Sequence, residues 1–113
     1  MSITVNCWEI WLARVAFEED PKQSKIRPVL VLDDGILCVI ESVPITSHAP
    51  RTYDFEDYQI QDWISCGLNK QSTIRFGHIT KISDNLFVKK LGTLSKRDMI
   101  QARIILKRHN IVL

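Results

Sequence analysis

The first part of the chain alternates apolar and polar positions in the way that β-strands do. Between residues 11 and 17, one face carries only apolar side chains: Trp11, Ala13, Val15 and Phe17. This period of two predicts a strand over Glu9–Phe17. The stretch that follows, Glu18–Lys25, is polar throughout and contains a proline, so it is predicted to be a loop.

A hairpin is predicted next. Two β-rich runs, Pro28–Leu32 and Ile36–Val43, are separated by Asp33–Gly35. This linker ends in an Asp-Gly pair, which between apolar runs is a strong hairpin signal because both positions tolerate positive φ. Since proline has no amide hydrogen to donate, Pro28 is expected at the start of its strand. The segment Pro44–Pro50 is predicted to leave the second strand as a turn.

Three later segments also favour β-structure. Tyr53–Trp63 is acidic and alternates poorly, which indicates an edge strand or an irregular crossing. Ser72–Ile82 is predicted to be one strand, with His78 and Phe76 on the same side. Asn85–Lys89 is predicted to be a further short strand before a Leu-Gly pair.

The C-terminal segment is the one clear helix. Ser95 followed by Asp98 fits a capping box, with Asp in place of the usual Glu or Gln. Apolar residues then recur at helical spacing: Met99, Ala102, Ile105 and Leu106. This stripe is predicted to pack in the core or against a second copy of the chain. Short strands followed by one helix predict a mainly β fold, a small, strongly bent antiparallel sheet or barrel closed by the helix.

The composition is that of an ordinary folded domain. The 113 residues are 45% apolar and 25% charged, which excludes a disordered tail and predicts a single domain over residues 1–113. The longest unbroken apolar runs are far too short to cross a membrane, so no membrane partner is expected. Three cysteines without a CxxC pair indicate a reduced, cytoplasmic compartment.

The net charge of +2 hides an uneven distribution. Residues 1–69 hold five basic and eleven acidic residues, a net charge of −6, whereas residues 70–113 hold ten basic and two acidic residues, a net charge of +8. Such asymmetry is common in proteins that bind a polyanion or an acidic peptide. Charged residues also simply solvate a surface, so the charge alone leaves both interpretations open.

Candidate chemistry is confined to the ends of the hairpin. The sequence has no P-loop, GxGxxG or HExxH motif and no His/Cys set with metal-ligand spacing, so neither a cofactor nor a metal is predicted. The two ends of a hairpin lie side by side, which brings Arg27 near three polar residues: Thr46, Ser47 and His48. A guanidinium and two hydroxyls can bind a phosphate. The alternative is a turn held by hydroxyl hydrogen bonds beside an arginine that pairs with a carboxylate.

Five segments in order resemble the MazF/PemK family. They are Glu9–Trp11, Lys25–Leu32, Pro44–Ser47, Gly67–Arg75 and Leu91–Ser95. Each is weak alone, but five in the right order are specific, and together they span nearly the whole chain. The resemblance implies a homodimeric toxin of a type II toxin–antitoxin system with an SH3-like barrel. Such a toxin cuts single-stranded RNA without metal or cofactor and binds an acidic antitoxin.

The resemblance also assigns residues to the site. The family's active-site arginine and threonine correspond to Arg27 and Thr46. One branch of the family has a second arginine followed two residues on by an aspartate; Arg75 matches this arginine, but Gly77 stands where the aspartate would be. His48 is the candidate general base or acid, because histidine changes its charge near neutral pH. RNA contacts are expected from four residues: Lys25, Ser47, Arg75 and His78.

Two other functions remain open. One is an SH3-like binding module without catalytic activity, a possibility that the missing aspartate keeps open. The other is a toxin of the related CcdB-like fold that poisons DNA gyrase by protein contact alone. The Arg-Pro and Thr-Ser segments favour the nuclease over the gyrase toxin.

Overall fold

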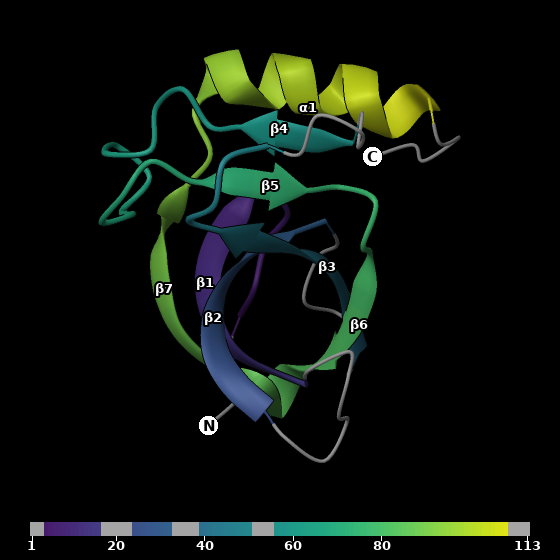
Figure 1. Cartoon of the computed structure of the whole chain (residues 1–113). Helices are drawn as coiled ribbons and strands as arrows, with labels where there is room; N and C mark the ends of the chain where they lie inside the picture. The colour runs from purple at the N-terminus through teal and green to yellow at the C-terminus, as the bar shows by residue number, and fades with distance from the viewer. Residues whose placement is uncertain (1–3, 17–23, 33–38, 51–55, 109–113) are drawn as a thin grey trace.

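The computed structural model describes residues 4–16, 24–32, 39–50 and 56–108, which form a curled antiparallel sheet with a helix lying across one end (Figure 1). In chain order the strands are β1 (Glu9–Ala16), β2 (Ser24–Val31), β3 (Val39–Thr46), β4 (Asp57–Gln59), β5 (Thr73–Arg75), β6 (Thr80–Ser83) and β7 (Phe87–Thr93). A 3₁₀ turn, η1 (Asp84–Leu86), precedes β7, and the helix α1 spans Lys96–Arg108. The predicted mainly β fold with a C-terminal helix is confirmed.

The sheet divides at β3. Its path runs β4-β5-β3-β2-β1-β7, and β6 pairs with β3 off this path. The first half of β3, residues 39–42, pairs with β6, whereas Ile45 and Thr46 pair with β5. The strand therefore continues to Thr46, and the prediction that it ends at Val43 is wrong. Pro44 is tolerated because it lies where β3 changes partner, so its missing amide hydrogen interrupts no ladder on that side.

β2 begins earlier than predicted. The residues just before Pro28 belong to the strand rather than to a loop, so Pro28 lies inside the strand and not at its start. β2 pairs with β1 over residues 24–30 but with β3 only over residues 29–31. Pro28 therefore occupies a stretch with one open edge, which is where a sheet tolerates proline. Phe17, the last residue of the first predicted strand, lies outside the described residues, as do residues 18–23 of the predicted loop and residues 33–38, which hold the predicted hairpin turn.

The predicted strand Ser72–Ile82 is two strands. β5 and β6 are separated by a turn that contains Gly77, and in it the His78 amide donates to the Arg75 carbonyl at 3.1 Å. The turn lets β5 pair with the end of β3 while β6 pairs with its beginning. A single strand is the wrong prediction here, because the alternation continues across the turn.

The acidic segment before β5 supplies an edge strand, as predicted. β4 stands at one end of the sheet path and pairs only with β5 among the described strands. Residues 51–55, which include the start of the predicted segment, lie outside the described residues.

β7 begins two residues later and ends four residues later than the predicted Asn85–Lys89, whose first two residues lie in η1. Two glycines let the end of β7 lie against another turn. A Cβ on Gly92 would come within 2.5 Å of the Cys66 carbonyl oxygen. Gly67 has a φ of +85°, and a Cβ there would overlap the Leu91 carbonyl oxygen. The turn around Cys66 therefore packs directly on the backbone of β7, an approach that only glycine permits.

The core lies between the sheet and α1. Three residues of the predicted helical stripe, Ala102, Ile105 and Leu106, are buried in the larger apolar cluster, and Met99 packs partly buried against it. The stripe therefore packs in the core. Trp11 anchors a smaller cluster in which its ring contacts another aromatic side chain edge to face. At 13 residues, α1 is too short to cross a membrane, and the described residues include no other helix that could.

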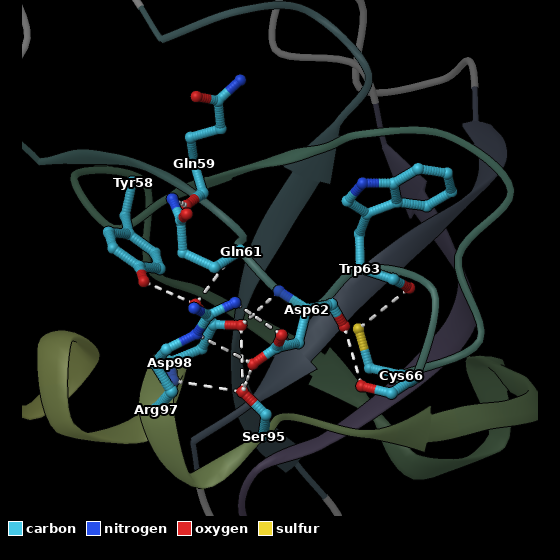
Figure 2. A network of polar contacts seen from close by, with 10 residues as sticks. Tyr58, Gln59, Gln61, Asp62, Trp63, Cys66, Ser95, Arg97 and Asp98 are labelled. Carbon is cyan, nitrogen blue, oxygen red and sulfur yellow. Dashed lines mark hydrogen bonds and ion pairs between the residues drawn. The ribbon is translucent and has the colours of Figure 1, made fainter.

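The start of α1 is fixed by the buried carboxylate of Asp98 (Figure 2). The Asp98 amide donates to Ser95 Oγ at 3.2 Å, which confirms Ser95 as the N-cap. The carboxylate accepts a hydrogen bond from the Tyr58 hydroxyl at 2.5 Å, and burial together with this bond raises the pKa of Tyr58 above its usual range. It also accepts from the amides of Gln61 at 3.0 Å and Asp62 at 2.9 Å. Asp98 thus ties β4 and the following loop to the helix.

A second buried carboxylate, Glu9, stands at the start of β1. It accepts hydrogen bonds from Trp11 Nε1 at 3.0 Å and from the Asn6 amide at 2.8 Å. Its Oε2 also pairs with Lys90 Nζ of β7 at 2.8 Å. Burial raises the pKa of Glu9, but the hydrogen bonds from Lys90, Trp11 and Asn6 outweigh burial and lower the pKa to about 2.

This lowered pKa predicts a pH-dependent contribution to stability. Ionised Glu9 stabilises the fold at pH values above its ordinary pKa of 4.5, and the contribution is lost as the pH falls toward 2. We expect Glu9→Gln to lower the free energy of unfolding by about 2 kcal/mol at pH 7 and by less than half as much at pH 3. Urea denaturation at the two pH values measures this, and equal losses at both would contradict the assignment.

Candidate functional site

The ends of β2 and β3 meet, as expected for a hairpin. Val29 pairs with Pro44, and continuing this register by two residues sets Arg27 beside Thr46. Both residues line one cavity of about 670 Å³. The antiparallel pairing therefore brings the guanidinium and the hydroxyl to the same place.

This main cavity gathers most of the residues that the sequence singles out. Five of them line it: Lys25, Arg27, Thr46, Ser47 and His48. Two basic residues that the sequence did not single out, Lys70 and Lys89, line it as well. The described lining thus holds four cations and no carboxylate, which favours the binding of an anion.

Lys70 and Lys89 come together at the cavity because the turn around Gly67 packs on the backbone of β7. Lys70 follows the turn that contains Gly67, and Lys89 belongs to β7, the strand on which that turn packs. Gly67 and Gly92 are the only local signal for this arrangement in the sequence. The sequence does not show that the segments around these two glycines pack together. The position of Lys70 and Lys89 at the cavity therefore could not be predicted from it.

The hydroxyl and the imidazole at the cavity are already in contact. Thr46 Oγ1 lies 2.9 Å from His48 Nδ1, and the His48 amide donates to the same oxygen at 3.2 Å. The His48 carbonyl accepts a hydrogen bond from Thr73 Oγ1 of β5 at 2.8 Å. The segment after β3 is therefore held against β5, and the side chains of Thr46 and His48 form one hydrogen-bonded unit.

Arg75 lies in a second, smaller cavity that adjoins the first. This cavity of about 240 Å³ is lined by Thr46, His48, Ala49, Asp57 and Arg75. Thr46 and His48 line both cavities. Arg27 of β2 and Arg75 of β5 come from the two strands that flank β3.

His78 contacts Arg75 but lines neither cavity. Its Nε2 lies 3.1 Å from Arg75 Nη2. Gly77, beside it, is exposed in the turn and has no side chain to offer. An aspartate does lie beside Arg75, but it comes from β4: Asp57 Oδ1 is 3.9 Å from Arg75 Nε. Sequence reasoning missed Asp57 because it comes from a different strand.

Among the residues that the structure describes, no three His, Cys, Asp or Glu side chains lie close enough together to hold a metal ion.

A comparison with protein families identifies the chain. The family described as "PemK-like, MazF-like toxin of type II toxin-antitoxin system" matches residues 6–109. The chain belongs to this family of toxins. The match extends over both cavities and the helix, and it confirms the resemblance found in the five sequence segments. Comparison of the sequence with individual characterised proteins gives no significant match.

Solved structures that include MazF toxins share the fold of this chain. The Mycobacterium tuberculosis toxin MazF-mt6 is 19% identical and superposes with a TM-score of 0.69 over 93% of this chain and 99% of that one. An endoribonuclease from a mycobacterial species is 12% identical, with a TM-score of 0.71 over 96% and 92% of the two chains. A MazE–MazF structure from Deinococcus radiodurans is 13% identical, with a TM-score of 0.72 over 97% and 99%.

Proposed function

We propose that this toxin is a sequence-specific endoribonuclease that cleaves single-stranded RNA, with messenger RNA as the substrate. The observation that carries the proposal is the main cavity, where Arg27 meets Thr46 and His48 among four cations and no described carboxylate. Its charge suits a phosphodiester, and its side chains offer donors for developing negative charge and a group for proton transfer. The mycobacterial endoribonuclease of the same fold agrees with this chemistry.

The reaction is transesterification within the RNA. The 2′-hydroxyl oxygen attacks the adjacent phosphorus and loses its proton to a base, while the bond from phosphorus to the 5′-oxygen breaks. The departing oxygen takes up a proton. The products are a 2′,3′-cyclic phosphate and a 5′-hydroxyl end, and no step requires a metal or a cofactor.

The residues of the main cavity divide this work. Arg27 stabilises the dianionic phosphorane, since its guanidinium presents paired N–H donors to phosphate oxygens. It cannot act as the base because arginine stays protonated in proteins. His48 serves in proton transfer through Nε2, while its Nδ1–H donates to Thr46 Oγ1, so that the Thr46 hydroxyl keeps its own hydrogen as a donor beside the phosphorus. Lys25, Ser47, Arg75 and His78 bind the RNA backbone, and of these Arg75 corresponds to the second arginine of one family branch.

The same basic surface suits an acidic partner. Structures of the family include MazE–MazF assemblies, and we infer that this toxin is neutralised by an antitoxin whose acidic segment covers the main cavity. The toxin acts as a homodimer in the cytoplasm. The antitoxin is proposed from family membership and the charge of the main cavity, whereas the homodimer and the cytoplasmic location are proposed from family membership alone.

A cleavage assay separates this proposal from its alternatives. Purified toxin is incubated with long single-stranded RNAs of varied sequence in EDTA, and the new ends are identified by enzymatic end-labelling and mass spectrometry. We expect cuts at a recurring sequence with cyclic phosphate and 5′-hydroxyl ends. A binding module would bind the RNA and leave it intact, and a gyrase toxin would leave RNA intact while inhibiting DNA supercoiling; either result would overturn the proposal.

A further inference from the structure

We propose that Asp57 is a positioning residue that holds the guanidinium of Arg75 against the small cavity beside Thr46 and His48. The proposal rests on the ribonuclease function above and adds a residue that the sequence motifs do not include. It assigns the carboxylate of the site to β4, the strand paired with the β5 strand of Arg75, rather than to the turn after β5.

Strand pairing places the two residues directly opposite each other. Asp57 of β4 pairs with Arg75 of β5 in the antiparallel register. The Asp57 side chain is only 2% exposed, and its Oδ1 lies 3.9 Å from Arg75 Nε, with both atoms shielded from solvent. A carboxylate buried to this degree needs a cation beside it, because water no longer compensates its charge. Asp57 and Arg75 therefore constrain each other.

The orientation of the guanidinium follows from its second contact. Arg75 Nη2 lies 3.1 Å from His78 Nε2. Since a guanidinium can only donate, Nε2 must accept, and His78 carries its proton on Nδ1. The Asp57 carboxylate thus attracts the guanidinium at Nε through charge across 3.9 Å, with no hydrogen bond between Oδ1 and Nε, while His78 accepts a hydrogen bond from Nη2. This fixes the cation at the wall of the small cavity, which Thr46 and His48 also line.

A fixed cation at this wall benefits a reaction at Thr46 and His48. Side chains around a reacting phosphate act well only when their orientation is set before the substrate arrives, and the supporting residues supply that orientation. Without the Asp57 carboxylate, Arg75 keeps its charge but loses the partner at Nε. Its electrostatic attraction for RNA then persists, while its alignment with the reacting group is lost.

Kinetics of Asp57→Asn test the proposal. We expect the single-turnover cleavage rate at saturating RNA to fall roughly 10- to 10²-fold, with the dissociation constant of the RNA nearly unchanged. Because Asp57 acts through Arg75, adding Asp57→Asn to Arg75→Ala should slow cleavage no further. Asp62→Asn is the matched control: it removes a carboxylate that pairs with Arg97 at 2.7 Å outside both cavities, and it should cleave as the wild type does. Thermal unfolding verifies that each variant is folded. If Asp57→Asn does not fold, Asp57→Ser is used in its place.

A second readout does not depend on catalysis. Nitrogen-15 NMR of the histidine rings should show His78 protonated at Nδ1 in the wild type, and this tautomer should be lost in Asp57→Asn. A wild-type cleavage rate in Asp57→Asn, an equal further loss on the Arg75→Ala background, or an unchanged His78 ring would each overturn the positioning role. A wild type that cuts no RNA would instead refute the ribonuclease function, and the positioning role with it.

Discussion

Replacing Arg27 by alanine is expected to reduce the rate of RNA cleavage by roughly 10²- to 10³-fold. This is the usual loss when one preorganised donor to a developing anion is removed. Arg27 lines the main cavity together with Thr46 and His48, and nothing else from β2 except Lys25 brings a charge there. Single-turnover cleavage at saturating RNA measures the effect without interference from weakened binding.

Arg14→Ala is the matched control for Arg27→Ala. Arg14 is an exposed arginine on β1, next to the residue that pairs with Arg27, and it lines neither cavity. Arg14→Ala lowers the net charge of the protein by the same amount as Arg27→Ala. Because Arg14 lies outside both cavities, we expect its removal to leave cleavage at saturating RNA close to that of the wild type. If the two variants slow cleavage equally, Arg27 contributes only general charge, and the assignment of the phosphorane contact is wrong.

Replacing Asp98 by alanine is expected to cause the largest loss of stability, about 3 kcal/mol or more. The substitution leaves the Tyr58 hydroxyl and the amides of Gln61 and Asp62 without their buried acceptor, and each unsatisfied buried donor costs roughly 1–3 kcal/mol. Urea denaturation gives the free energy directly. The melting temperature should fall by on the order of 10 °C.

The control for Asp98→Ala is Asp62→Ala. Asp62 binds the same helix start through Arg97 and Ser95 but stands in contact with solvent, where water replaces the lost contacts. We expect a much smaller loss for Asp62→Ala. If the two variants lose equal stability, the buried carboxylate is not what ties β4 to α1.

Much of the fold could be predicted because it depends on local patterns. Alternation over residues 9–17 marks β1, and the helical stripe that follows Ser95 marks α1. The meeting of Arg27 and Thr46 could also be predicted, because any hairpin with a central turn brings its outer ends together. These inferences use only neighbours in sequence or the symmetry of a single hairpin.

The predictions that were wrong or incomplete all depend on how the strands pair, which the sequence does not show. Pro28 and Pro44 lie inside strands because each occupies a stretch where one side lacks a partner, and the sequence does not show which side is paired. The turn at Gly77 was missed because the alternation continues across it. Asp57 was missed as a site residue because its relation to Arg75 depends on how β4 pairs with β5.

The most direct test of the account uses an RNA in which a single nucleotide is changed. Once a cleavage site is known, a substrate is made with a 2′-deoxynucleotide at the position 5′ to the cut and compared with the all-ribose RNA. We predict cleavage of the all-ribose RNA, with a 2′,3′-cyclic phosphate end, and no cleavage of the deoxy-substituted RNA at that site. Cleavage of the substituted RNA at a similar rate, or products with 5′-phosphate ends, would contradict attack by the 2′-hydroxyl in the main cavity.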